Sequence, residues 1–104
     1  MNKELSVISN AIVSKIKPIK IYLFGSRATG LSNDASDYDL CIIIDKKDKR
    51  RIDISIEAEL ALVGVTNKAT DIVVFYEDEF KDRANYIGTL EYAILKEGKV
   101  IYGK

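Results

Sequence analysis

The sequence predicts an α+β fold, in which a mixed β-sheet is flanked by helices. Two observations support this prediction. Short apolar runs have the length of buried strands, and longer segments repeat apolar residues with the period of a helix. With 104 residues the chain has room for one core and none for a second module, so we expect a single domain over residues 1–104.

The chain is expected to begin with a helix followed by a strand. Apolar side chains recur on one helical face across residues 3–16, at Leu5, Ile8, Ile12 and Ile16. Pro18 ends this helix at or before Lys17, because a proline disfavours the helical conformation in the residue before it. Ile19–Phe24 is the first predicted strand.

A turn and a loop connect this strand to the second one. Gly25 and Ser26 open a short turn or helix that extends to about Gly30. Residues 31–36 are rich in Ser, Asn and Asp and are expected to form a loop. Tyr38–Ile44 is the second strand, and its continuous apolar run predicts burial on both faces.

The middle of the chain is less clear. Residues 46–51 are expected to form an exposed basic loop, either a solvated turn or a contact for a nucleotide or an acidic partner. Residues 50–60 alternate like a strand but also belong to a helical stripe, which consists of Ile52, Ile56, Leu60 and Val63. The length of the segment and its alanine- and glutamate-rich second half favour a helix.

Three elements are predicted for the last third of the chain. Thr70–Phe75 is a third strand, and residues 100–102 could add a short edge strand. A helix is expected from Tyr86, or earlier, through Lys96, and Gly98 stops it. The residues of this helix that are expected to face inward are Ile87, Leu90 and Ile94.

Two polar motifs separated by ten residues are the most informative feature of the sequence. Gly25 and Ser26 follow the first strand, and Asp37-Tyr38-Asp39 opens the second. Because side chains alternate along a strand, Asp37 and Asp39 should point the same way. Neighbouring carboxylates repel each other and need a cation, and hard oxygen ligands suit Mg²⁺. A Gly-Ser turn offers N–H groups and a hydroxyl to phosphates. The motifs together indicate a metal-dependent nucleotide site.

A third aspartate, Asp71, opens the third strand. Three aspartates at the starts of neighbouring strands could converge on one rim of the sheet, which suits phosphoryl transfer assisted by two metal ions. Asp71 could bridge to the second ion or accept a proton. Taken alone, it could equally be a cap at the start of a strand. Arg27 is within reach of a phosphate, although exposed arginines are common in turns.

Other families that use these motifs fit less well. Phosphatases of the haloacid-dehalogenase type carry Asp-x-Asp after a strand, whereas here the strand follows the motif. Sugar-nucleotide glycosyltransferases with this motif need a much larger chain. The Gly-Ser turn also lacks the Gly-Lys-Ser/Thr of a Walker A loop and the Gly-x-Gly-x-x-Gly of a dinucleotide-binding fold.

The composition excludes several classes of site. The chain has no histidine, which excludes Ser-His-Asp and Cys-His triads, and its single cysteine excludes an internal disulfide. Sixteen basic residues balance sixteen acidic ones, so we expect no general attraction to nucleic acid or to anionic membranes. The first ten residues lack the apolar segment of a signal peptide, and no run approaches the roughly 20 residues that span a bilayer. We therefore expect a cytoplasmic protein without membrane contact.

Three segments carry a likeness to a known family. They are Gly25-Ser26-Arg27-Ala28-x-Gly30, Ser36-Asp37-Tyr38-Asp39-Leu40 and Asp71-Ile72-Val73. These segments resemble the minimal nucleotidyltransferases of the DNA polymerase beta superfamily, and the ending over residues 95–102 resembles the way these small proteins close. Thr29 stands where many members carry a second basic residue.

The resemblance implies a polymerase-beta-like nucleotidyltransferase core and a role for each motif. Gly25, Ser26 and Arg27 are expected at the nucleotide triphosphate. The aspartates of the other two segments are the expected catalytic residues and ligands of Mg²⁺, which is expected as two ions; they are Asp37, Asp39 and Asp71.

The resemblance also implies a biological role. Members of this group are typically antitoxins that pair with a helical HEPN ribonuclease and inactivate it by transferring AMP from ATP to a tyrosine. The expected partners are therefore ATP and a HEPN toxin, with which the chain could form a hetero-oligomer. Two alternatives stay open: an antitoxin that acts only by docking, and a nucleotidyltransferase for small molecules. The first leaves three carboxylates unexplained, and the second lacks a domain that binds the acceptor.

Overall fold

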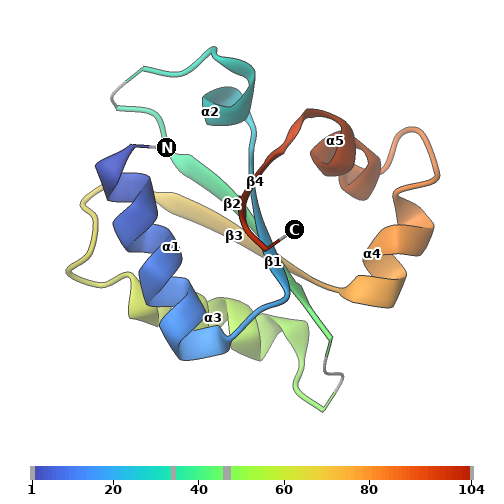
Figure 1. The fold of residues 1–104 in the computed structure, drawn as a ribbon, viewed down its shortest axis with the longest axis horizontal. Coiled ribbons are helices and arrows are strands. Elements are labelled where there is room, and N and C mark those ends of the chain that lie inside the picture. The colour runs from blue at the N-terminus through green and yellow to red at the C-terminus, as the bar shows by residue number, and fades with distance from the viewer. Residues whose placement is uncertain (1, 34, 46–47, 104) are drawn as a thin grey trace.

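The fold is centred on a mixed β-sheet (Figure 1). The computed structural model describes residues 2–33, 35–45 and 48–103, which form a four-stranded sheet in the order β3-β2-β1-β4. The strands are β1 Lys20–Phe24, β2 Tyr38–Ile44, β3 Thr70–Tyr76 and β4 Lys99–Tyr102. β1 is antiparallel to β2 and β4, whereas β2 and β3 are parallel. The predicted α+β class is confirmed, and so is the short edge strand near the C-terminus.

Helices cover both faces of this sheet (Figure 1). They are α1 Lys3–Ile16, α2 Ser26–Thr29, α3 Arg51–Ala61, α4 Glu77–Arg83 and α5 Leu90–Glu97. Residues of α1 and α3 share one hydrophobic cluster with the sheet, and residues of α4 and α5 share a second cluster on the opposite face. The short helix α2 follows β1 directly at one end of the sheet.

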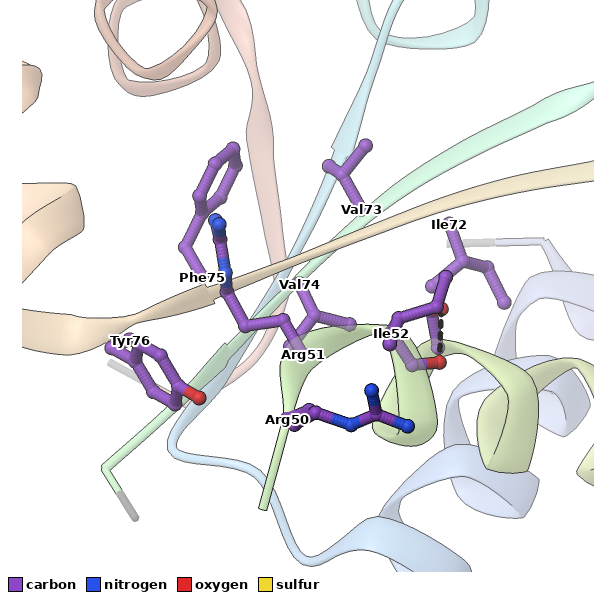
Figure 2. Close-up of a pocket in the computed structure, with 9 residues that line it drawn as sticks. Arg50, Arg51, Ile52, Ile72, Val73, Val74, Phe75 and Tyr76 are labelled. Carbon is purple, nitrogen blue, oxygen red and sulfur yellow. Dashed lines mark hydrogen bonds between the residues drawn. The ribbon is translucent and has the colours of Figure 1, made fainter. Parts of the chain in front are cut away.

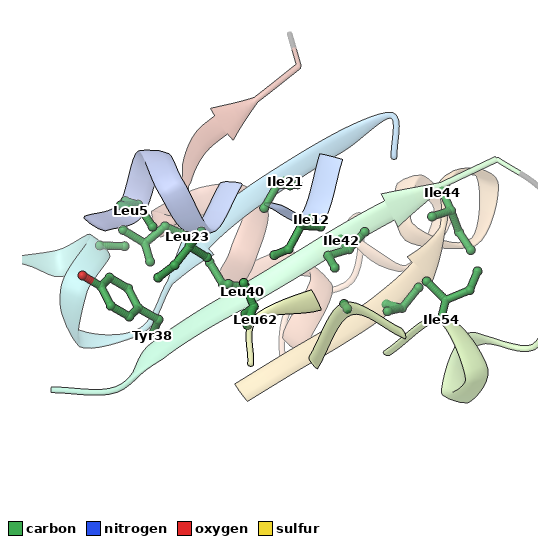
Figure 3. Packing of buried hydrophobic residues seen from close by; sticks show 14 residues of the cluster. Leu5, Ile12, Ile21, Leu23, Tyr38, Leu40, Ile42, Ile44, Ile54 and Leu62 are labelled. Carbon is green, nitrogen blue, oxygen red and sulfur yellow. The ribbon is translucent and has the colours of Figure 1, made fainter. Parts of the chain in front are cut away.

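β2 is a central strand and is buried on both faces, as its apolar run predicts. One set of its side chains packs against α1 and α3 (Figure 3); this set is Tyr38, Leu40, Ile42 and Ile44. The alternate residues Cys41 and Ile43 belong to the cluster on the α4 and α5 side. By the same alternation, Asp39 lies on the α4 and α5 side of the sheet, opposite Tyr38.

Helix α1 has the boundaries that the sequence predicts. Asn2 caps its start, because the Asn2 Oδ1 atom accepts a hydrogen bond from the Leu5 backbone N–H at 2.6 Å. At the other end, Lys17 has a positive φ of 57° and its N–H donates to the Val13 carbonyl. Pro18 follows, so the helix cannot continue.

Replacing Lys17 by Gly should stabilise the protein. A left-handed conformation costs a residue with a β-carbon about 1–2 kcal/mol, and the greater freedom of glycine in the unfolded chain offsets part of the gain. We expect the free energy of unfolding, measured by urea denaturation, to rise by ~0.5–1 kcal/mol. Lys15→Gly, in the last turn of the same helix, is the control and should lower it by about 1 kcal/mol. Equal losses for both variants would contradict this account of the helix end.

Helix α3 is confirmed, but the apolar stripe that favoured it faces solvent. The residues Ile52, Ile56, Leu60 and Val63 are all exposed. The helix is buried instead through a second stripe, two positions further along the chain than the first, which consists of Ile54, Ala58 and Leu62. The small side chain of Ala58 is fully buried and lets the helix approach the sheet closely. Either stripe satisfies helical periodicity, so periodicity alone could not select the buried one.

The last third of the chain differs from the prediction in two ways. Helix α4 was not predicted, and the helix expected from Tyr86 or earlier begins only at Leu90. Gly88 has a φ of 97° and interrupts the helical path, and the Thr89 side chain then caps α5 by accepting from the Tyr92 N–H at 3.0 Å. Among the residues expected to face inward, Ile94 is buried, whereas Ile87 and Leu90 are exposed.

The segments between these elements agree with the prediction as far as they are described. Residues 31–33 and 35–36 lie outside helices and strands. In the predicted basic loop, Lys46 and Lys47 lie outside the described residues; residues 48–50 are exposed, and Arg51 is already the first residue of α3. No helix in the described part of the chain is long and apolar enough to cross a membrane.

Candidate active site

The ends of three neighbouring strands meet at the predicted site. β1 ends at Phe24, which pairs with Asp39 near the start of β2, and Asp39 pairs with Asp71 near the start of β3. The Gly25 turn therefore lies beside Asp39, and Asp71 lies beside Asp39 on the neighbouring strand. This register results from the antiparallel pairing of β1 with β2 and the parallel pairing of β2 with β3.

Gly25 approaches the Asp39 carboxylate closely. Its backbone has φ 71° and ψ −153°, a conformation that is essentially restricted to glycine. A β-carbon at this position would overlap with the Asp39 carboxylate, at Oδ2. The absence of a side chain at Gly25 thus lets the backbone turn and the Asp39 carboxylate come together.

Partial burial and the neighbouring carboxylates make Asp39 harder to ionise. The pKa of Asp39 is raised above its usual value, first by partial burial and then by the charges of Asp71 and Asp37 and a side-chain hydrogen bond with Asp71. A cation bound beside Asp39 would favour its ionised form, which burial and the neighbouring carboxylates disfavour. The donor set is therefore suited to a hard divalent cation such as Mg²⁺.

Asp37 completes the motif but is less closely involved. It immediately precedes β2 and is exposed, whereas Asp39 is half-buried. Within the described residues, no group of three Asp, Glu or Cys side chains is gathered closely enough to hold a metal ion. Because Mg²⁺ is commonly held by one or two carboxylates together with substrate phosphates, two adjacent carboxylates still fit such an ion.

A cavity of about 450 Å³ opens beside the two motifs. Its lining joins the Gly-Ser turn to the loop before β2 and to the aspartates, and consists of Ser26, Asn33, Ala35, Ser36, Asp37 and Asp39. A polar hollow next to clustered carboxylates is the arrangement expected for a nucleotide triphosphate with its cation.

Arg27 contacts the loop before the aspartates. Its Nε and Nη2 atoms both donate to the Ser36 carbonyl, at 3.0 Å and 2.7 Å, and its guanidinium lies 4.0 Å from the centre of the Tyr38 ring. Ser36 directly precedes Asp37, so Arg27 supports the segment that carries the aspartates. Direct contact between Arg27 and a phosphate stays a prediction.

Comparison with known proteins identifies the family. Residues 7–104 match the family model described as polymerase beta, nucleotidyltransferase. The chain belongs to this family. The family model thus covers nearly all of this nucleotidyltransferase chain, and it contains all three predicted aspartates and the Gly-Ser turn.

Solved structures share the same fold. One is a protein from Sulfolobus solfataricus assigned as a nucleotidyltransferase, with 22% identity and a TM-score of 0.61, over 98% of this chain and 79% of that chain. Another is a toxin–antitoxin structure with AMP-PNP, with 21% identity and a TM-score of 0.60, over 99% of this chain and 75% of that chain. No curated protein matches significantly. The TM-scores, which extend over nearly the whole chain, support a common fold.

Sequence reasoning missed a group of residues behind the site, on the α1 and α3 side of the sheet. Glu4 in the first turn of α1 accepts hydrogen bonds from Tyr38, Thr66 and Lys68. Because Glu4 is separated from these partners by 34 to 64 positions, no local pattern in the sequence could have indicated the group.

A larger groove lies away from the predicted site residues of this nucleotidyltransferase. It has a volume of about 530 Å³ and runs between the start of α3 and the outer strand β3 (Figure 2). Figure 2 shows Arg50, Arg51 and Ile52 on one side and residues 72–76 of β3 on the other. None of Gly25, Ser26, Arg27 and the three predicted aspartates lines it, whereas Arg50 and Arg51 of the predicted basic loop do.

Proposed function

We propose that this member of the family is a Mg²⁺-dependent nucleotidyltransferase that uses ATP, with its site at the Gly25 turn and the aspartates. The observation that supports the proposal most strongly is the pairing of Asp39 with Asp71 next to a glycine that leaves no space for a side chain. Asp39 and Asp71 would hold the first ion, Asp37 and the substrate phosphates would complete the ligands of the ions, expected to be two, and Gly25 and Ser26 would bind the triphosphate. Mg²⁺ bound there would neutralise phosphate charge and favour the ionised acceptor.

The chain's own residues would position the reaction. The Ser26 hydroxyl and the backbone of the turn orient the triphosphate so that the α-phosphorus faces the acceptor. The acceptor oxygen forms a bond to the α-phosphorus, the bond from that phosphorus to the bridging oxygen breaks, and pyrophosphate leaves. The acceptor proton passes to a site carboxylate, for which we propose Asp71.

We further propose that the acceptor is a protein, namely a tyrosine of a HEPN-type ribonuclease toxin that this antitoxin inactivates by adenylylation. The structural similarity to a toxin–antitoxin structure with AMP-PNP supports this proposal, as does the resemblance of the motifs to those of minimal nucleotidyltransferases. The cytoplasm, where ATP and such a ribonuclease would be available, is the proposed location.

Transfer of a labelled nucleotide tests this function directly. With Mg²⁺, ATP labelled at the α-phosphate and the proposed HEPN-type partner, we expect the label to appear on that protein, on a tyrosine. Ser26→Ala should slow the transfer by about 10-fold to 100-fold, because the triphosphate is held less firmly. Arg50→Ala, in the exposed segment before α3, should leave the rate nearly unchanged. The rate of label incorporation is the measurement.

Two other outcomes of this experiment would favour the alternatives. If the ribonuclease is blocked by stoichiometric complex formation without any label, the protein acts by docking alone. If the label appears only on a small hydroxylated or aminated compound and not on the protein partner, the acceptor is a small molecule.

A further inference from the structure

A charged cluster lies behind the strand that carries the aspartates. At its centre, Glu4 Oε1 accepts from the Tyr38 hydroxyl at 2.7 Å and from the Lys68 ammonium at 2.6 Å, and Glu4 Oε2 accepts from the Thr66 hydroxyl at 2.9 Å. We call Glu4, Tyr38, Thr66 and Lys68 the rear clamp. The Glu4 carboxylate is firmly ionised, because these hydrogen bonds, led by that from Lys68, lower its pKa to about 2.

The rear clamp joins three segments that are far apart in the sequence. Glu4 belongs to the first turn of α1, Tyr38 is the first residue of β2, and Thr66 and Lys68 lie in the connection that leads to β3. At the point where β2 meets this connection, the Tyr38 N–H donates to the Ala69 carbonyl at 3.0 Å. The clamp therefore acts where the pairing of β2 with β3 begins.

Tyr38 links the clamp to the front of the sheet. Its side chain is 1% exposed on the α1 and α3 side, and its sequence neighbours on both sides are Asp37 and Asp39. The Arg27 guanidinium lies 4.0 Å from its ring centre and the Lys68 ammonium 5.9 Å. With its ring enclosed and its hydroxyl hydrogen-bonded, Tyr38 has little freedom to move.

We propose that Glu4, Tyr38 and Lys68 are positioning residues for metal binding, which hold the start of β2 and the approach to β3 in register so that Asp39 and Asp71 face the same cation. This inference rests on the proposed function. Residues that orient metal ligands without touching the metal commonly contribute about 10-fold to 100-fold in metal affinity. Here the rear clamp would contribute to the affinity for the metal ion indirectly. It would act through Tyr38, from the α1 and α3 side of the sheet, and none of its side chains would contact the nucleotide.

The test compares nucleotide binding with and without the cation. The affinity of the purified protein for AMP-PNP is measured by calorimetry at 25 °C, once with Mg²⁺ and once with EDTA. The dissociation constant in EDTA divided by that in Mg²⁺ gives the part of the affinity that depends on the metal, and this quotient is called the ratio below. We expect Tyr38→Phe, which removes only the hydroxyl, and Glu4→Ala to reduce this ratio about tenfold, with little change in the affinity in EDTA.

Two further variants separate positioning from general stability. Glu4→Gln keeps an acceptor oxygen for Tyr38 and Lys68, so we expect it to restore much of the ratio that Glu4→Ala loses. Glu91→Gln is the matched control, because Glu91 is buried and forms an ion pair with Arg83 at 2.8 Å that joins α4 to α5. This control should lower the melting temperature but leave the ratio at the wild-type value.

The outcomes distinguish this inference from the function on which it rests. A wild-type protein whose affinity for AMP-PNP is the same in Mg²⁺ and in EDTA would overturn both. A wild-type protein that responds to Mg²⁺, together with Tyr38→Phe and Glu4→Ala variants that keep the full ratio, would overturn the rear clamp alone. If Glu4→Ala does not fold, Tyr38→Phe decides, because it keeps the buried ring.

Discussion

Replacing Asp37 and Asp39 together by Asn should abolish nucleotidyl transfer and most of the stabilisation that Mg²⁺ with ATP provides. Both carboxylates belong to the proposed donor set, and the amide side chains of Asn carry no charge to attract a cation. A ligand present at 100 times its dissociation constant stabilises a folded protein by about 2.7 kcal/mol. We therefore expect a clear rise in melting temperature for the wild type and almost none for the double variant, measured by thermal denaturation with and without Mg²⁺–ATP.

Without ligand, the same double variant should be at least as stable as the wild type. The folded state raises the pKa of Asp39, which means that it disfavours the ionised carboxylate, through burial and the charges of Asp71 and Asp37. At neutral pH the ionised group therefore destabilises the fold, and a neutral side chain removes that cost. As the pH falls through the raised pKa of Asp39, the contribution of this carboxyl to the free energy of unfolding should likewise increase, whereas the stabilisation from Glu4, whose pKa is lowered, is lost at more acidic pH.

Asp53→Asn is the control for this experiment. Asp53 is an exposed carboxylate in α3 that pairs with Arg50 at 3.0 Å, so its loss changes the net charge without touching the site. The control should transfer nucleotide and respond to Mg²⁺–ATP like the wild type. If the double variant and the wild type gave the same ligand response, the metal and nucleotide would have to bind elsewhere.

Local patterns in the sequence were sufficient to predict the strands and the pairing that brings two of the candidate site residues, Asp39 and Asp71, together. The apolar run that begins at Leu40 and ends at Ile44 favours a strand buried on both faces, and it is buried in that way. Once β2 and β3 are neighbours, the two aspartates at their starts come together, and the structure pairs Asp39 with Asp71 directly. Such inferences succeed because they depend on residues that are close in the sequence.

The helices of the second half show where such patterns fail. Helix α4 has seven residues, of which only Phe80 is buried, so it is too short to show periodicity. Ile87 and Leu90 are apolar but exposed, and the glycine at position 88 breaks the path between them. In α3, the choice between two apolar stripes depends on which one the sheet can accommodate, which is a property of the assembled core.

The contacts of the rear clamp could not be predicted from the sequence, for a different reason. A glutamate in the first turn of a helix, such as Glu4, is expected to stabilise the helix by its charge alone. Its contacts with Tyr38 and Lys68 exist only because the fold brings α1 to the start of β2 and the approach to β3. Contacts across such sequence separations have no local signature.

Replacing Gly25 by Ala should reduce the rate of nucleotidyl transfer by about 100-fold. The added methyl group displaces the Asp39 carboxylate, and a small misplacement of a catalytic group can cost a factor of this size in rate. A β-carbon at Gly25 would overlap with Asp39 Oδ2, and the backbone conformation itself is strained for any residue other than glycine. A carboxylate displaced by the methyl group would lose its side-chain hydrogen bond with Asp71. The measurement is the initial rate of transfer at a temperature well below the melting point of the variant.

Gly30→Ala distinguishes displacement of Asp39 from backbone strain. Gly30 also has a positive φ, of 84°, but the space around its hypothetical β-carbon is open. This variant should lose about 1–2 kcal/mol of stability from the left-handed backbone. Its transfer rate below the melting point should stay close to that of the wild type, because no atom of the site has to move. Equal losses of activity in the two variants would show that the turn acts through its general stability, and the close approach of Gly25 to Asp39 would then have no role in catalysis.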